Sequence, residues 1–232
     1  KIANDSLDIL FDLAYIAAWY LDDIIDLNMF PIVSASRAAL LTRNIGVGIT
    51  GVAGYFILNG VRYGSDKSLE IAENLIYTLE YGSTKFSTDM AKYKGVFPLY
   101  KLSQYATKYG FNPFLANDEK GYITELNKYP RRNIATTSLA PEGTRSRVME
   151  VPELGDTGTG IEPLYALKYK RYITLPNENK RVETNYVVKL LENELVNDIA
   201  DVDINKVLLD LDLYGIQYII DKYDLDSEKY SI

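Results

Sequence analysis

The sequence predicts an α/β fold that is rich in helices, and three stretches of the chain support this prediction. Residues 6–27 and 66–93 each repeat apolar side chains at helical spacing, which indicates two long helices with one buried stripe. Residues 133–139 are mostly β-branched or apolar and contain no glycine or proline, which is typical of a strand. With 232 residues, the chain is long enough to bury a sizeable core.

The first helix, over residues 6–27, is expected to be amphipathic and buried on one side, with Asp5 or Ser6 as its cap. Near its end stand Asp22, Asp23 and Asp26, whose carboxylates are of the type that binds metal ions. No matching acidic set is visible elsewhere in the sequence. We therefore interpret the three acids as a solvated helix end.

The second long helix begins after Ser65 or Asp66, either of which can cap it, and Gly95 and Pro98 end it. Its apolar stripe is interpreted as core. Further helices are expected over residues 100–109, 118–128, 186–199 and 207–223, with a polar loop at 176–180.

The composition excludes several classes of function. The chain has no cysteine, which excludes disulfides and thiol nucleophiles, and no histidine, the commonest general base and zinc ligand. A net charge of −7 argues against a nucleic-acid-binding surface. No segment approaches the roughly 20 apolar residues that cross a membrane, so we expect no membrane partner and a cytoplasmic location.

The strand over residues 133–139 runs into a turn that is suited to open a helix. The backbone N–H groups at such a helix start form an anion site, and a glycine lets the backbone approach a ligand closely. Arg131 and Arg132, before the strand, supply either charge toward a substrate or a solvated strand start. We predict a phosphate-binding loop, with an ordinary strand-to-loop junction as the alternative. Its residues are Ala140, Pro141, Glu142, Gly143, Thr144, Arg145 and Ser146.

A second glycine-rich stretch, Gly46 to Gly51, fits the Gly-x-Gly-x-x-Gly pattern of dinucleotide-binding proteins, and the acidic Glu70 follows at about the expected distance. However, no clear strand precedes Gly46, because residues 37–42 are more readily helical, and no βαβ unit of the right length follows. These observations count against a dinucleotide site. We therefore rank an NAD-dependent enzyme below the two hypotheses given next and keep it as the third.

Residues 137–146, together with Gly-Ile-Glu-Pro-Leu-Tyr-Ala-Leu at 160–167, resemble the catalytic subunit of ribonucleotide reductase, and most closely its adenosylcobalamin-dependent (class II) branch. The segment from Arg43 to Ala53 also resembles that family, where its glycines serve close packing. The resemblance implies that residues 1–175 are part of a ten-stranded α/β barrel. Residues 176–232 are expected to form a diverged, acidic, helical tail.

In that family the loop Ala-Pro-Thr-Gly-Thr holds the phosphates of the ribonucleotide substrate, and here Glu142 replaces the usual threonine. The resemblance also implies a radical reaction that needs one radical cysteine and a reducing cysteine pair. Since this chain has none, we expect a companion reductase chain to carry the cysteines. Adenosylcobalamin is expected in the complete enzyme. The second hypothesis is a catalytically inactive nucleotide-binding or assembly protein with the same fold.

Overall fold

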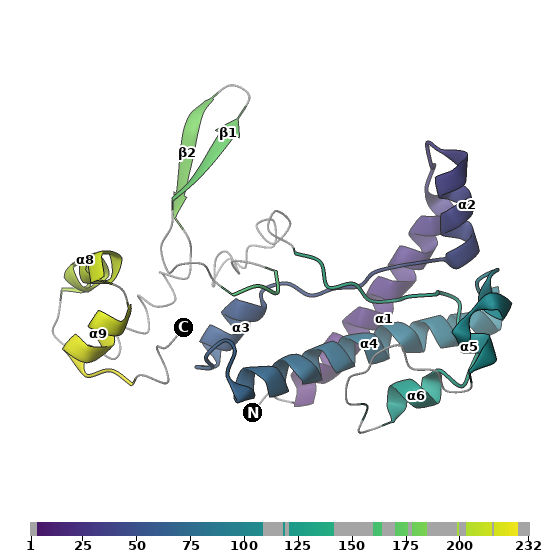
Figure 1. Cartoon of the computed structure of the whole chain (residues 1–232), viewed down its shortest axis with the longest axis horizontal. Coiled ribbons are helices and arrows are strands. Elements are labelled where there is room, and N and C mark those ends of the chain that lie inside the picture. The colour runs from purple at the N-terminus through teal and green to yellow at the C-terminus, as the bar shows by residue number, and fades with distance from the viewer. Residues whose placement is uncertain are drawn as a thin grey trace. The chain divides into compact units, whose positions relative to one another are not determined.

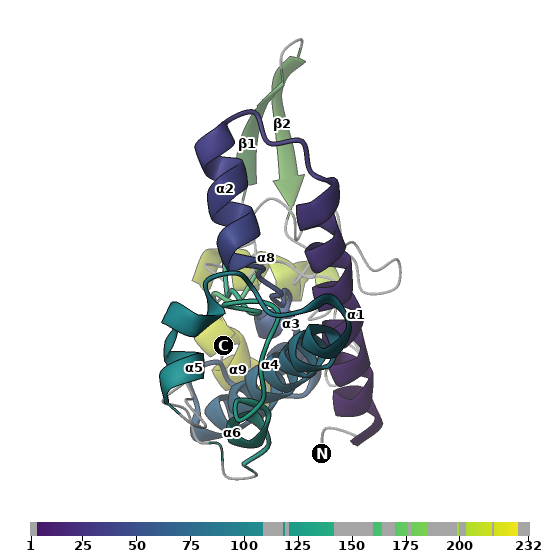
Figure 2. The ribbon, with the colours of Figure 1, turned by 90° about the vertical axis from the view of Figure 1, so that its right-hand side faces the viewer.

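The computed structural model divides the chain into two compact units (Figures 1 and 2). The first unit comprises Lys1–Gly48 and Ala72–Leu139, and the second comprises Ile49–Ile71 and Ala140–Ile232. The structure describes residues 4–108, 118, 121–141, 160–163, 170–175, 178–184, 199, 203–214 and 216–226.

Helices dominate the first unit. The two long predicted helices are confirmed, with ends within two residues of the expected ones, whereas the helix expected over residues 100–109 is two short pieces separated at Ser103. The elements are α1 (Asn4–Leu27), α2 (Val33–Thr42), η1 (Tyr100–Leu102), α5 (Gln104–Thr107), α6 (Tyr122–Leu126) and most of α4 (Asp66–Lys94).

Helix α1 packs directly against α4, as Figures 1 and 2 show. Ala14 and Ala18, on one side of α1, are almost completely buried. A Cβ atom placed on Gly82 of α4 would lie 2.4 Å from the carbonyl oxygen of Phe11. Small residues on both helices therefore allow the two backbones to come close, and Phe86 fills the adjoining space with no exposed surface.

Two extended segments of the first unit, residues 43–47 and 134–138, pair in parallel. The N–H of Val47 donates to the carbonyl of Thr136 at 2.9 Å, and its own carbonyl accepts from the N–H of Ser138 at 3.0 Å. This is the one parallel pairing within the described residues, and it confirms an extended conformation for the predicted strand. The described part of the chain is helix-rich, as expected, and does not itself display a closed barrel.

The second unit contains one antiparallel hairpin, in which Tyr172 pairs with Val182. Its second strand begins at Glu178, inside the stretch that was expected to be a polar loop followed by helix. The helix expected over residues 207–223 forms as two helices, and that expected over 186–199 lies outside the described residues except for its last residue, Ile199. The elements are α3 (Val52–Leu58), β1 (Lys170–Leu175), β2 (Glu178–Thr184), α8 (Ile204–Tyr214) and α9 (Ile216–Tyr223).

Helix α3 was not predicted, because seven consecutive, mostly apolar residues have no clear period and fit a helix or a strand equally well.

Within the described part of the chain, no helix combines the length and the apolar character that spanning a bilayer requires.

Candidate functional site

The predicted phosphate loop is only partly within the described residues. Ala140 is half-buried and Pro141 is exposed, and both have irregular backbone conformation. The other five predicted residues, Glu142, Gly143, Thr144, Arg145 and Ser146, lie outside the described residues. The structure therefore describes the segment that leads into the loop, and this segment is unusually rich in buried polar groups.

Arg131 and Arg132, which precede this segment, are both buried, so the expectation of a solvated strand start is wrong. The Nε of Arg131 donates to the carbonyl of Asn133 at 2.9 Å, and its Nη1 donates to the side chain of Asn127 at 3.2 Å. Its guanidinium lies 4.4 Å from the ring centre of Tyr105, a cation–π contact. These contacts are all within the protein, so Arg131 supports the fold at this point.

The guanidinium of Arg132 pairs with the carboxylate of Asp22, which lies near the C-terminal end of α1. Its Nε donates to Oδ2 of Asp22 at 2.7 Å, while Nε of Arg43 and the amide of Asn133 each donate to Oδ1 at 2.9 Å. Asp22 has no exposed surface, so its interpretation as part of a solvated helix end is wrong. Arg43 and Arg132 follow Asp22 by 21 and 110 positions. Helical periodicity relates only residues a few positions apart, so it could not predict either pair.

The carboxylates of Asp22, Asp23 and Asp26 approach one another within 4.8 Å, a spacing that would suit a metal ion. However, Arg43 also donates from Nη1 to Asp26 at 2.7 Å, and Lys94 donates to Asp23 at 2.7 Å. The hydrogen bond from Arg43 holds the pKa of Asp26 below its ordinary value. Each acid thus has a cationic side chain as its partner, and the cluster ties α1 to the strand segments.

Helix α4 places a row of buried polar side chains beside the strand segment. Glu80, Thr84 and Ser87 recur at helical spacing, and we call them the polar row of α4. Ser87 Oγ accepts hydrogen bonds from the backbone N–H groups of Arg132 and Asn133, at 3.1 and 2.9 Å. The N–H of Arg132 also donates to the backbone carbonyl of Ser87 at 3.0 Å, so this turn of α4 satisfies two buried backbone donors.

Glu80 holds the end of the segment that lies nearest the predicted loop. Thr137 Oγ1 donates to Glu80 Oε2 at 2.6 Å, and Thr84 Oγ1 donates to Oε1 at 2.9 Å. Burial raises the pKa of Glu80, and the hydrogen bond from Thr137 opposes that rise. Thr137 stands three positions before Ala140, so the row fixes the chain just before the loop begins.

Sequence reasoning missed the polar row because it considered only the apolar stripe of α4. The available signal was the recurrence of polar residues at positions 80, 84 and 87, the spacing of a helix face.

Gly46 and Gly48, from the stretch that fits the dinucleotide-binding pattern, lie against Ser138 of the strand segment before the loop. A Cβ atom on Gly46 would lie 2.7 Å from Cβ of Ser138, and one on Gly48 would lie 2.5 Å from the carbonyl oxygen of Ser138. Both glycines thus allow two strands to approach, as the resemblance implied, and the space beside them is filled by protein. This arrangement argues against the NAD hypothesis.

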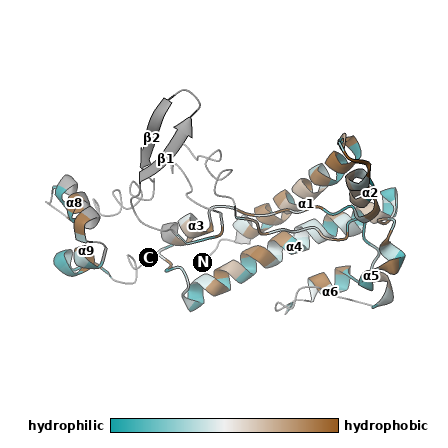
Figure 3. Ribbon diagram, turned by 45° about the horizontal axis from the view of Figure 1, so that its top comes forward, coloured by the Kyte–Doolittle hydropathy of each residue, from teal (hydrophilic) through white to brown (hydrophobic). Residues whose placement is uncertain are grey.

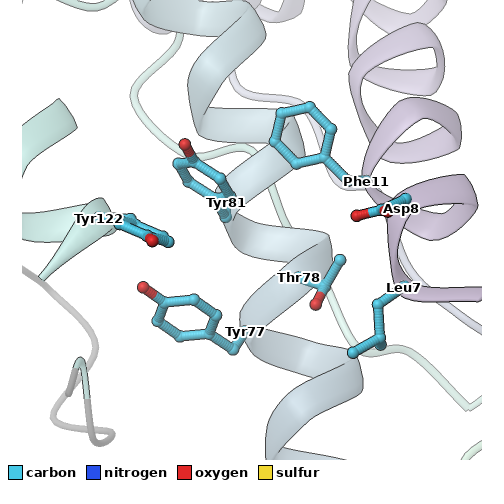
Figure 4. Close-up of a pocket in the computed structure, with 7 residues that line it drawn as sticks. All are labelled: Leu7, Asp8, Phe11, Tyr77, Thr78, Tyr81 and Tyr122. Atoms are coloured by element: carbon cyan, nitrogen blue, oxygen red, sulfur yellow. The ribbon is translucent and has the colours of Figure 1, made fainter. Parts of the chain in front are cut away.

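The first unit also has an open pocket of about 550 Å³ between α1, α4 and α6 (Figure 4). The phenol of Tyr77 donates to Asp118 at 2.8 Å beside it, and the described residues that line it include no lysine or arginine. Acidic and aromatic walls do not suit a phosphate, so we do not assign the substrate loop to this pocket. The lining residues are Leu7, Asp8, Phe11, Tyr77, Thr78, Tyr81 and Tyr122.

Comparison with known proteins identifies the family. The sequence model of the ribonucleotide reductase barrel domain matches residues 2–223. The chain is 30% identical over 166 residues to a vitamin B12-dependent ribonucleoside-diphosphate reductase of Mycobacterium tuberculosis (strain CDC 1551 / Oshkosh), covering 72% of this chain and 20% of that protein. It is 29% identical over 199 residues to the protein of the same description from Thermoplasma acidophilum, covering 84% of this chain and 23% of that protein.

A further relative is the ribonucleoside-diphosphate reductase subunit alpha of Haemophilus influenzae, which is 27% identical over 177 residues, or 70% of this chain and 22% of that protein. The chain thus spans about a fifth of the length of these curated relatives. Since all three are described as reductases, the alternative of an inactive protein is not favoured. The match over almost the whole chain shows that it belongs to the ribonucleotide reductase family, as part of the barrel domain of the large subunit.

Proposed function

We propose that this chain supplies the substrate-phosphate loop of a ribonucleotide reductase catalytic subunit. The observation that carries the proposal is the anchoring of residues 132–137 by the polar row of α4, directly before Ala140–Ser146. A loop that binds a charged substrate needs a rigid support, because positioning loses its value when the binding groups can drift.

Within this proposal, the backbone N–H groups of residues 142–146 bind the phosphates. Gly143 permits close approach of the backbone, Thr144 and Ser146 donate hydroxyl hydrogen bonds, and Arg145 adds a charge-assisted one. A carboxylate beside the phosphates would repel them, so the replacement of the family's threonine by Glu142 opposes tight binding. The substrate class is a ribonucleotide, and the names of the relatives favour a ribonucleoside diphosphate.

The radical and reducing steps belong to another part of the enzyme. This chain has no cysteine, so the thiyl radical and the reducing pair must come from a companion reductase chain or from further sequence of the same subunit. The role of this chain is then to orient the ribose over the radical cysteine by holding the phosphates. Orientation of this kind contributes several kcal/mol to catalysis in general, on the order of 7 or more in favourable cases.

Adenosylcobalamin is the proposed radical-generating cofactor of the complete enzyme, because two of the relatives are described as vitamin B12-dependent. This chain has no cysteine that could receive the radical that the cofactor would generate. We therefore assign the cofactor to the remainder of the catalytic subunit and derive no step through it.

The test is ribonucleoside diphosphate binding by the complex purified from its source, measured by calorimetry, with reduction to the deoxyribonucleotide measured in parallel. Gly143→Val, which fills the space needed by the phosphates, is expected to abolish binding. Thr144→Val removes one hydroxyl at nearly constant volume and is expected to weaken binding about tenfold.

Thr107→Val is the matched control, because Thr107 is exposed on α5 and lies outside the loop. It should leave the affinity unchanged. Unchanged affinity in Gly143→Val would remove the loop from the substrate site, and a wild-type complex that binds no ribonucleotide would overturn the proposed function.

A further inference from the structure

The open pocket between α1, α4 and α6 has a wall of aromatic rings. The ring centre of Tyr81 lies 5.0 Å from that of Phe11 and 5.2 Å from that of Tyr122. The ring of Tyr77 is stacked with that of Tyr81 at 6.5 Å between centres, so four rings from three helices form one surface. The pocket volume of about 550 Å³ is within the roughly 300–1,000 Å³ that is usual for small-molecule sites.

The charges that adjoin this pocket are negative. Asp8 of α1 is a lining residue, and within the described part of the chain it has no cationic partner. Burial opposes the ionisation of Asp118, beside the pocket, but hydrogen bonds from Thr124 and Tyr77 outweigh it and hold the pKa of Asp118 below its ordinary value. In Figure 4 the tyrosines lie on the side of α4 and α6, and Asp8 lies on the side of α1.

Hydrogen bonds hold the aromatic wall in place. The phenol of Tyr77 donates to Oδ1 of Asp118 at 2.8 Å, and Oδ2 of the same carboxylate accepts from the N–H of Thr124 at 2.8 Å. One carboxylate thus ties a ring of α4 to the backbone of α6. A wall that is already ordered loses little side-chain entropy when a ligand binds, which favours affinity.

We propose that this pocket binds an organic ammonium ion, either quaternary or a protonated amine. Aromatic faces attract cations through the negative charge of their π-systems, and the carboxylate of Asp8 supplies the opposite charge. An anionic ligand would meet acids, with no lysine or arginine among the described lining residues. None of these residues belongs to the predicted phosphate loop, so the two sites can be tested separately.

The test is an NMR titration of the complete 232-residue chain with three probes. Choline is the quaternary ammonium probe, spermidine represents protonated amines, and 3,3-dimethylbutan-1-ol has the shape of choline without its charge. We expect saturable binding of at least one cation, at least tenfold tighter than that of the alcohol. The tighter of the two cations identifies the kind of ammonium group. No saturable binding of either cation, or equal binding of the alcohol, would overturn the inference.

Two variants with matched controls place the ligand in this pocket. Tyr122→Leu removes one ring of the wall and should weaken cation binding about fivefold. Tyr129→Leu is its control, because Tyr129 is 51% exposed, close to the 48% of Tyr122, and does not line the pocket. Asp8→Asn should weaken binding about threefold, whereas Asp12→Asn, also exposed on α1, should not. Equal effects in a variant and its control would contradict the assignment.

The titration is then repeated on the complex purified from its source, where the cation should still bind. Loss of binding in the complex would show that another part of the enzyme covers the pocket, and this would overturn the inference. Cation binding by a complex that binds no ribonucleotide would overturn the proposed function and leave the ammonium site standing. Ribonucleotide binding without cation binding would do the reverse.

Discussion

The carboxylate of Asp22 and the guanidinium of Arg132 are 110 positions apart in the sequence and 2.7 Å apart in the fold, where both are buried. Through this contact the end of α1 holds the residue that opens the strand leading to the predicted substrate loop. Arg43 binds the same carboxylate from the neighbouring strand segment. One buried aspartate thus joins three separate parts of the first unit.

Asp22→Asn is expected to destabilise the fold by about 2–3 kcal/mol, because two buried guanidinium groups lose one of the two carboxylates that pair with them, while Asp26 remains as the other. Figure 3 colours the helix α1 that carries both acids by hydropathy. The measurement is urea unfolding of the purified chain, followed by circular dichroism. Asp23→Asn is the control: its ion pair with Lys94 is partly exposed, so its loss should cost less than about 1 kcal/mol. Equal losses in the two variants would show that the buried network does not hold the fold.

Gly46→Ala and Gly48→Ala should each cost about 1–3 kcal/mol, since the added Cβ atom meets Ser138 at less than 3.0 Å in both cases. The two variants should respond differently to Ser138→Gly. That change removes the Cβ atom that opposes Gly46, but it keeps the carbonyl oxygen that opposes Gly48. Denaturation midpoints should therefore recover only for the Gly46 variant, and recovery of both, or of neither, would contradict the strand contact.

The stability of the first unit should depend on pH through Glu80. Burial raises its pKa in the folded chain above the ordinary value of 4.5, so the folded state binds the proton more tightly than the unfolded state. This contribution is present below pH 4.5 and is lost as the pH rises through the raised pKa.

The free energy of unfolding of the wild type, relative to that of Glu80→Gln, should thus decline as the pH rises above 4.5. Urea unfolding at several pH values measures the difference. A constant difference between wild type and Glu80→Gln would exclude the raised pKa.

Arg131→Lys should destabilise the chain by roughly 2–3 kcal/mol, although it keeps the charge. Lysine cannot reproduce the fork that reaches Asn133 and Asn127, nor the planar contact with Tyr105. Thermal unfolding by calorimetry checks this prediction. Arg37→Lys, at an exposed position of α2, should change the midpoint by little, and a similar shift in both variants would argue against a specific role for Arg131.

The long helices α1 and α4 could be predicted because their apolar periodicity is local and survives in a single sequence. The extended segment before the loop could be predicted for the same reason. The short helix α3 and the hairpin of β1 and β2 could not, because brief segments satisfy more than one period and depend on their neighbours. The predicted loop itself rests on local chemistry and family membership.

The sequence by itself determined the family, the main helices and the absence of cysteine and histidine, all of which are properties of residues in order along the chain. Only the tertiary structure decided which polar residues are buried. Asp22, Glu80 and Arg132 look like surface residues in the sequence, and burying their charges is costly unless partners are supplied. Those partners come from distant positions in the sequence. Whether such a charged side chain is exposed to water or buried in an ion pair is therefore decided by contacts between separate elements.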